Sequence, residues 1–224
     1  MSYSIDFEKV TISMYKKELL KRQMIPSRQI LKNEADVHFD AFKKAGIKTL
    51  GRLFAVLKNN KAKSELLNIE NVSDEYLTVL LRELKSFLPA SVKLNEFHWI
   101  SDNTIKKINA VGISNSRELY EKFWKSKDRK DFVNVTGIDE KDIVELLKLS
   151  DLTRIQWVNS TFAHVLFLAG FDTVRKVSDA SPEDMFTKVT QKNIELKLYK
   201  GNIGLNDMKL CIEAAKLIDA EIEV

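Results

Sequence analysis

The sequence is poor in cysteine, glycine and proline, and each shortage excludes a class of protein. A single cysteine, Cys211, rules out an internal disulfide and a cysteine-based metal site, and it favours a reducing compartment. Seven glycines and three prolines in 224 residues are too few for a loop-rich β fold. No window approaches the ~18 consecutive apolar residues that a membrane helix requires.

Signals for export and for β-strands are also missing. Residues 1–6 show no basic stretch followed by an apolar run, so we expect a cytoplasmic protein without a membrane segment. No segment sustains the period-two alternation of a half-buried strand. Because 44% of the residues are hydrophobic and 30% are charged, we expect an all-α chain with a real core.

One short pattern is present three times. It consists of an apolar helix, a small residue and a glycine, an apolar residue, and then a Thr or Asn ahead of a second apolar helix. Its glycines are Gly46, Gly112 and Gly170. Glycine ends a helix in the left-handed conformation without a Cβ penalty, and Thr or Asn caps the helix that follows. The pattern therefore predicts three helical hairpins, each with a glycine at positive φ.

The repeat extends beyond the turn. Gly112 follows Gly46 by 66 residues, and at that offset 67–72 align with 133–138. Repeats of this length are typical of arrays of small helical units that bury apolar faces against their neighbours. We predict a compact helical array of about three units, 34–90, 91–150 and 151–224, after an N-terminal helical segment, 1–33.

Helix boundaries follow from caps, prolines and apolar periodicity. Ser181-Pro182-Glu183-Asp184 is the clearest helix start in the chain. The expected helices are 5–22, a short one after Pro26, one ending at Gly46, one capped by Thr49 through Leu57, 73–88, 103–111, 116–125, 139–149, one from Ser181, and 206–220.

The segment from Arg154 to Val177, followed by 181–186, resembles the repeated unit of a bacterial helix-hairpin-helix family catalogued only as a domain of unknown function. The resemblance covers Glu34 to Leu217 and rests on the Ala-Gly-apolar-x-Thr turn and on the Asp-Leu-x-Arg-Ile lead-in. It implies tandem helix-hairpin-helix-like units. In nucleic-acid-binding relatives, the hairpin glycines let backbone N–H groups converge on a phosphate.

This chain has other residues where the family has glycines. Trp157 and Asn159 stand there in the last copy, and Trp99 and Ser101 in the copy before. We expect both tryptophans to be packing residues that plug the hairpins, in which case they are largely buried. The alternative is that they are exposed and stack on a base.

Basic residues concentrate in the first two units. Residues 41–64 contain seven bases and no acid, whereas the equivalent part of the third unit, 181–184, is acidic. The candidate nucleic-acid-binding residues are Lys43, Lys44, Lys48, Arg52, Lys58, Lys61 and Lys63, with Lys125, Lys127, Arg129 and Lys130 in the loop of the second unit. They form either a merely solvated face or a phosphate-binding edge. The second interpretation predicts that both groups lie on one contiguous face.

Nothing in the sequence indicates catalysis. No histidine has a partner at metal-ligand spacing, Cys211 fits a core position, and the loop 200–204 lacks the Lys-Ser/Thr of a P-loop. We expect no catalytic residue, cofactor, metal, membrane contact or small-molecule substrate. The hypothesis is a non-catalytic module that binds the DNA or RNA phosphate backbone weakly and without sequence preference. The alternative is a protein-binding adaptor or self-associating scaffold without nucleic-acid binding.

Overall fold

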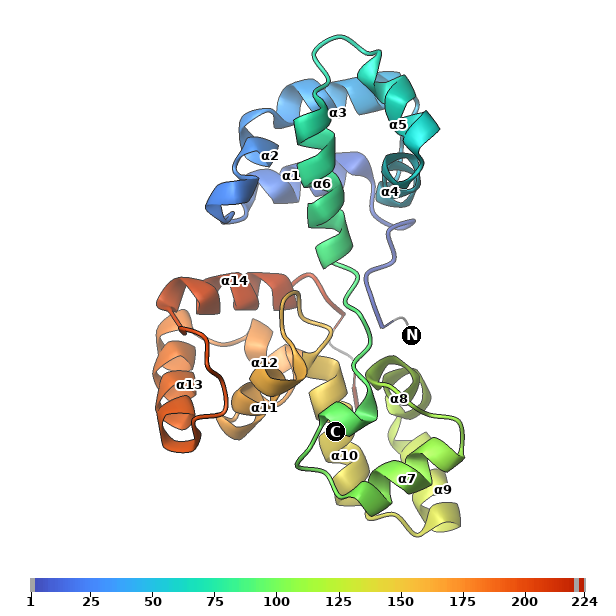
Figure 1. Cartoon of the computed structure of the whole chain (residues 1–224), viewed down its shortest axis with the longest axis vertical. Coiled ribbons are helices and arrows are strands. Elements are labelled where there is room, and N and C mark those ends of the chain that lie inside the picture. The colour runs from blue at the N-terminus through green and yellow to red at the C-terminus, as the bar shows by residue number, and fades with distance from the viewer. Residues whose placement is uncertain (1–2, 220–221, 224) are drawn as a thin grey trace. The chain divides into compact units, whose positions relative to one another are not determined.

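The computed structural model describes residues 3–219 and 222–223, which form two compact units (Figure 1). The N-terminal unit is Ile5–Phe87. The C-terminal unit comprises Tyr3, Ser4 and the described residues from Leu88 onward. From Tyr3 onward, the described chain therefore starts in the C-terminal unit, passes through the N-terminal unit and returns.

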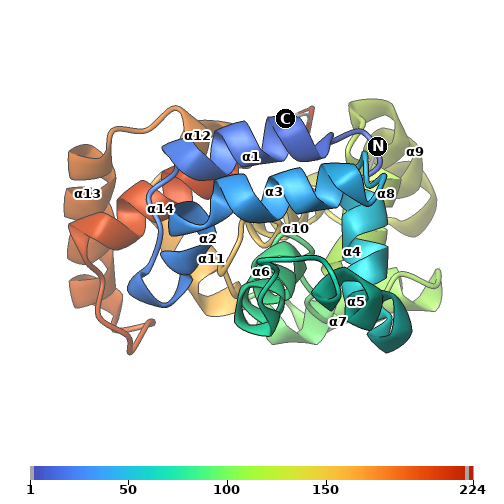
Figure 2. The same ribbon diagram turned by 90° about the horizontal axis from the view of Figure 1, so that it is seen from above.

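The N-terminal unit packs its helices around a core rich in aromatic and leucine side chains. Its helices are α1 (Ile12–Lys21), α2 (Ile30–Asn33), α3 (Ala35–Lys44), α4 (Leu50–Lys58), α5 (Asn60–Leu67) and α6 (Asp74–Ser86), with a 3-10 turn η1 at Pro26–Arg28. Helices α1 and α3 lie side by side (Figure 2), and α6 packs on α2 and α4. Phe39, Phe42, Leu53 and Leu77 are completely buried.

The C-terminal unit is built around one central helix. Its elements are η2 (Leu94–Glu96), α7 (Asp102–Ala110), α8 (Ser116–Phe123), α9 (Ser126–Thr136), α10 (Glu140–Leu152), α11 (Ser160–Leu168), α12 (Val174–Ser178), α13 (Pro182–Leu196) and α14 (Leu205–Ala215). Helix α10 contacts α8, α9 and α11, while α14 packs on α12 and α13 (Figure 1). The apolar stripe of α10 explains its place, because Ile143, Leu146 and Leu147 are all fully buried.

The expected all-α class is confirmed. The described residues contain no strands, only the isolated bridges Thr11–Thr49 and Lys93–Asn115. None of the helices in the described part of the chain is long and apolar enough to cross a membrane.

The three glycine turns have the predicted geometry. Gly46, Gly112 and Gly170 follow the ends of α3, α7 and α11 with φ of 73°, 83° and 92°. The residue three positions after each glycine caps the next helix with its side chain, as Thr49 does for the N–H of Arg52. Local sequence therefore determines where these six helices end or begin.

The helix order follows the 66-residue offset over four successive helices. Helix α4 shifted by 66 residues covers 116–124, and α8 spans Ser116–Phe123. The same shift places α6 at 140–152, the bounds of α10. We refer below to the four-helix segments α3–α6, α7–α10 and α11–α14.

Equivalent backbone groups in these segments also have equivalent partners. In the first segment, the N–H of Leu50 at the start of α4 donates to the carbonyl of Val10 at 2.8 Å. In the second segment, the N–H of Ser116 at the start of α8 donates to the carbonyl of Val92 at 2.7 Å. In the third segment, the N–H of Val174 donates to a carboxylate oxygen of Asp151 at 2.8 Å. The orphan donor that each helix start creates is thus satisfied from outside the hairpin in all three cases.

Three helix expectations are wrong. The first helix begins at Ile12, not near residue 5, because Thr11 caps it and residues 5–10 form turns. The basic loop expected in the second unit is helix α9, and the equivalent basic segment of the first unit is helix α5. Both have few buried residues and so lack the periodicity that would have revealed them. The last helix ends at Ala215, earlier than the expected end at residue 220. Residue 220 itself lies outside the described residues.

Candidate functional site

Of the seven basic side chains predicted to bind nucleic acid in the N-terminal unit, five are exposed and form no ion pair with a described residue. We call them the basic surface. They are Lys44 at the end of α3, Lys48 in the glycine turn, Arg52 and Lys58 on α4, and Lys61 in the first turn of α5. Their positive charge is therefore available to an external partner.

The pattern of α4 explains why its bases point outward. Leu50, Leu53, Val56 and Leu57 are buried and occupy one side of the helix, whereas the bases fall on the opposite side. A helix of 9 residues is about 13 Å long, so this surface has bases near both ends of α4. The Nζ of Lys58 also lies over the ring of Phe54, 5.3 Å from its centroid.

Two predicted members of the first group already have acidic partners. Lys63 lies 2.6 Å from Asp74 and donates to Thr78 at 3.1 Å, with only 19% of its side chain exposed. Lys43 is exposed but lies 3.6 Å from Asp40. We therefore exclude both from the basic surface.

The N-terminus of α4 is occupied by an internal carboxylate. Glu8 accepts the hydroxyl hydrogen bond of Thr49 at 3.0 Å and lies where a Cβ on Gly51 would fall. Helix N-termini favour anions because their N–H groups lack partners. Here a carboxylate of the chain fills that role, so an external phosphate has to be bound by side chains.

The second basic group lies in the C-terminal unit, around α9. Lys125, Lys127 and Lys130 are exposed, and Lys125 Nζ lies over the Trp124 ring. Arg129 is buried, and its guanidinium donates to the carbonyls of Phe123, Trp124 and Glu223. The assignment of Arg129 as a phosphate ligand is thus wrong. The predicted common face of the two groups involves both units and stays a prediction.

The tryptophan hairpin of the third segment differs from the expectation. Trp157 is 49% exposed and has φ of +69°, a conformation that L side chains rarely adopt. The prediction that it is largely buried is therefore wrong. Its backbone adopts a left-handed conformation that would suit glycine, while its side chain is half exposed to solvent.

Trp99 is partly buried and packs against another ring. Its ring stacks on the imidazole of His164, with centroids 3.5 Å apart and an interplanar angle of 8°. The stack partly encloses the imidazole, and this burial lowers the pKa of His164 from its ordinary value near 6.5 to about 4. The ring is therefore neutral at physiological pH.

We expect His164 to make stability depend on pH. Between about pH 4 and 6.5 the unfolded chain binds the proton and the folded chain does not, so stability falls as the pH is lowered through this window. The full shift would correspond to about 3.4 kcal/mol, and partial exposure of the ring reduces our expectation to about 1–2 kcal/mol. Urea unfolding at about pH 7 and about pH 4.5 measures it, with His164→Phe as the variant that keeps a stacking ring.

Comparing the wild type with His164→Phe assigns the pH dependence to this histidine. His164→Phe should lose that part of the pH dependence, while His98→Phe, at an exposed position, should retain it. Equal pH dependence in wild type and His164→Phe would contradict the assignment.

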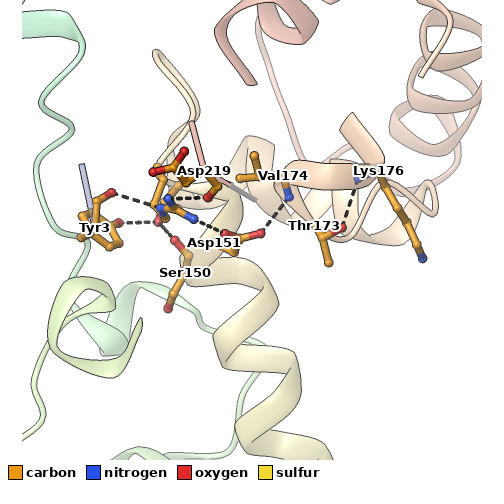
Figure 3. Close-up of polar contacts among 9 residues, drawn as sticks. Tyr3, Ser150, Asp151, Thr173, Val174, Lys176 and Asp219 are labelled. Carbon is orange, nitrogen blue, oxygen red and sulfur yellow. Dashed lines mark hydrogen bonds and ion pairs between the residues drawn. The ribbon is translucent and has the colours of Figure 1, made fainter. Parts of the chain in front are cut away.

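A buried polar cluster lies at the end of α10, where the lead-in to the hairpin begins (Figure 3). Arg154 donates to Asp151 Oδ1 at 2.6 Å, to the carbonyl of Tyr3 at 3.1 Å and to the carbonyl of Asp219 at 2.9 Å. The other oxygen of Asp151 accepts the N–H of Val174. Burial raises the pKa of the Asp151 carboxyl, and Arg154 counteracts it.

Tyr3 completes this cluster. Its hydroxyl lies 2.8 Å from Ser116 Oγ and 2.9 Å from Thr153 Oγ1, and its ring is 1% exposed. Since these groups are buried and mutually hydrogen-bonded, the cluster ties chain segments together and offers no surface to a ligand. Sequence analysis missed it because the partners are up to 151 residues apart.

Two other potentially reactive side chains, those of His38 and Cys211, are inaccessible. His38 is buried, bonded to the Glu34 carbonyl and the Ser73 N–H, and stacked on Tyr76. Burial raises the pKa of the Cys211 thiol to about 12, so it stays protonated at neutral pH. Within the described residues, no three His, Cys, Asp or Glu side chains are grouped to hold a metal ion.

One family model matches the chain. It is described as Domain of unknown function (DUF4332) and covers residues 99–218, which is 120 of the 224 residues. No match was found among curated proteins or among solved structures.

Proposed function

Because the chain belongs to the DUF4332 family of domains of unknown function, we propose its function from its own residues. It is a non-catalytic, cytoplasmic binding module of helix-hairpin-helix-like units. Its basic surface binds the phosphate backbone of nucleic acid, here DNA, weakly and without sequence preference. The observation that carries this proposal is the presence of five exposed bases that have no ion pair to a described residue.

The spacing of the bases fits an extended polyanion. They run from the end of α3 along the outer side of α4 to α5, and α4 alone is about 13 Å long. Duplex DNA carries a charge about every 1.7 Å of its axis, so several phosphates fall within that length. A single small anion could contact only part of the surface.

The mode of binding follows from two features of the hairpins. Trp157 stands where related hairpins have a glycine, and Glu8 occupies the N-terminus of α4. Backbone N–H groups are therefore poorly placed to hold phosphate in either place. Lysine and arginine side chains supply the attraction instead, which gives salt-dependent binding with little base readout.

We expect Lys48→Gln with Lys61→Gln to flatten the salt dependence of DNA binding. Each lost phosphate contact lowers the slope of log affinity against log salt by about 0.9, so the double variant should lose about 1.8. Fluorescence anisotropy with a duplex of about 20 base pairs at several salt concentrations between about 50 and 200 mM measures the slope. A single-stranded oligonucleotide in parallel tests strandedness.

A matched double variant serves as the control. Lys209→Gln with Lys216→Gln removes the same charge from α14 and its end, far in sequence from the basic surface, and should leave the slope unchanged. An unchanged slope in the first variant, or the same loss in both, would sink the proposal. Absence of DNA binding at about 150 mM salt would favour the adaptor function.

Exposed apolar side chains favour a protein-binding adaptor as the second candidate. Val135 is 86% exposed, Ile194 69%, Val111 50% and Leu196 46%, all in the C-terminal unit. Such residues suit a protein interface when they form a contiguous patch. Sedimentation velocity over a range of concentrations tests self-association, and Ile194→Lys should abolish it if α13 contributes to the interface.

A further inference from the structure

A pocket of about 200 Å³ opens beside the Trp157 hairpin in the C-terminal unit. Its walls come from the hairpin, from α11, and from the loop and first turns of α14. Among the lining residues are Trp157, Phe162, Tyr199, Asp207, Met208 and Cys211. Residues that carry three aromatic rings and one carboxylate therefore line a single small space.

The same place is filled internally in the other two four-helix segments. In each segment this place lies between two residues. One precedes the turn glycine by eight positions, and the other follows the N-cap residue of the segment's fourth helix by three positions. The pairs are His38 and Tyr76, Thr104 and Asp142, and Phe162 and Asp207. The first pair stacks at 3.6 Å and the second is hydrogen-bonded at 2.7 Å. The members of the third pair instead line the pocket.

The charge of the lining decides what kind of group fits. Among the described residues that line the pocket, Asp207 is the only one with an acidic or basic side chain, so an anion would meet a carboxylate and no counter-charge. The α14 N-terminus adds roughly half a positive charge, which does not outweigh a full negative one. A purely apolar ligand would desolvate the carboxylate without compensating it. One carboxylate is also too few to hold a metal ion.

The aromatic walls favour an organic cation. The rings of Phe162 and Tyr199 are tilted, with centroids 5.1 Å apart, and Trp157 is half exposed at the same pocket. Aromatic faces attract ammonium groups, Trp most strongly, and sets of such rings recognise quaternary ammonium ligands. Trp157 adopts a positive φ that is unfavourable for an L side chain. The chain therefore carries an indole at a position where glycine would be less strained.

The size of the pocket limits the ligand. It is smaller than the 300–1,000 Å³ typical of drug-sized ligands. An apolar cavity of about 150 Å³ accepts benzene, so this pocket accommodates one compact head group.

We propose that the pocket formed by Trp157, Phe162, Tyr199 and Asp207 binds an alkylated ammonium group. The rings surround its methyl groups, and the carboxylate neutralises its charge. Asp207 is held for this role because one of its oxygens accepts the N–H of Gly204 at 2.9 Å. The site is independent of the proposed nucleic-acid binding, which uses the basic surface of the N-terminal unit.

Titration with choline tests the proposal, and its uncharged isostere 3,3-dimethylbutanol is the control ligand. Binding is followed by NMR chemical shifts of the Trp157 indole N–H, assigned with a variant at that position, and of the backbone N–H of Gly204, which both variants described below retain. We expect choline to bind at least about ten-fold more tightly than the isostere, a difference of about 1.4 kcal/mol. A trimethyllysine peptide in a parallel arm distinguishes a protein-borne ammonium group from a free small molecule, and tighter binding of either ligand supports the site.

Two variants remove the recognition without threatening the fold. Trp157→Gly takes away one wall and suits the positive φ, so its melting temperature should not fall. Asp207→Asn keeps an oxygen for the Gly204 N–H but removes the charge. Each should weaken choline binding at least about ten-fold. Equal binding of choline and its isostere, no saturation by about 10 mM, or unchanged binding in both variants would overturn the proposal.

Discussion

Replacing Arg154 with methionine should destabilise the C-terminal unit by about 3–5 kcal/mol. The substitution leaves Asp151 buried, at 1% exposure, without its positive partner. It also removes the donor to the carbonyls of Tyr3 and Asp219, which come from opposite ends of the chain. Urea unfolding followed by tryptophan fluorescence measures the loss, because all three tryptophans lie in this unit.

A partly exposed ion pair provides the control for Arg154. Lys176 lies 2.7 Å from Asp172, but 56% of its side chain is exposed, so Lys176→Met should cost below about 1 kcal/mol. In the double variant Asp151→Leu with Arg154→Met, the loss should be smaller than the sum of the single losses, since no buried charge remains. A loss below about 1 kcal/mol in Arg154→Met would show that the cluster does not hold these segments together.

Glu83→Gln should have a comparable effect on the N-terminal unit. Glu83 is 1% exposed and pairs with both Arg22, at 3.3 Å, and Arg28, which are themselves nearly buried. Neutralising it leaves two guanidinium groups buried close together without the carboxylate that balances them. We expect a loss of about 3–5 kcal/mol, measured by urea unfolding followed by circular dichroism.

The control for Glu83 is an acid on the surface. Glu18 lies 3.8 Å from Lys21, and both side chains are largely solvated, so Glu18→Gln should change stability by less than about 0.5 kcal/mol. Similar losses in the two variants would mean that burial does not govern the energetics here. An additional variant, Arg22→Met, should partly restore stability to Glu83→Gln because it removes one of the unbalanced charges.

The two stability clusters and the two proposed sites use different residues. Arg154 and Glu83 are buried and bind other parts of the chain, whereas the basic surface and the pocket face solvent. The binding variants should therefore leave unfolding almost unchanged, and the cluster variants should act through stability. This separation allows loss of binding to be distinguished from loss of folding.

The sequence by itself determined the all-α class, the three glycine turns and the starts of the helices that follow them. Gly170 ends α11 and Thr173 caps α12 because a left-handed dihedral angle and a capping hydrogen bond involve neighbouring residues only. The start of α13 at Ser181-Pro182 is equally local. The basic character of 41–64 was also evident, since it needs only a count of charges.

Only the tertiary structure decided which of those residues are free to act. Arg129 and Lys63 have the same charge as their exposed neighbours, yet both have internal partners. Arg129 donates to carbonyls that include that of Glu223, 94 residues away, and Lys63 pairs with Asp74. The local sequence predicted that Trp157 is a packing residue, but its exposure depends on the groups that surround the hairpin. The pocket likewise joins segments about 40 residues apart, 156–162 and 199–211. Burial and pairing depend on groups brought together by the fold, and a local pattern contains no information about them.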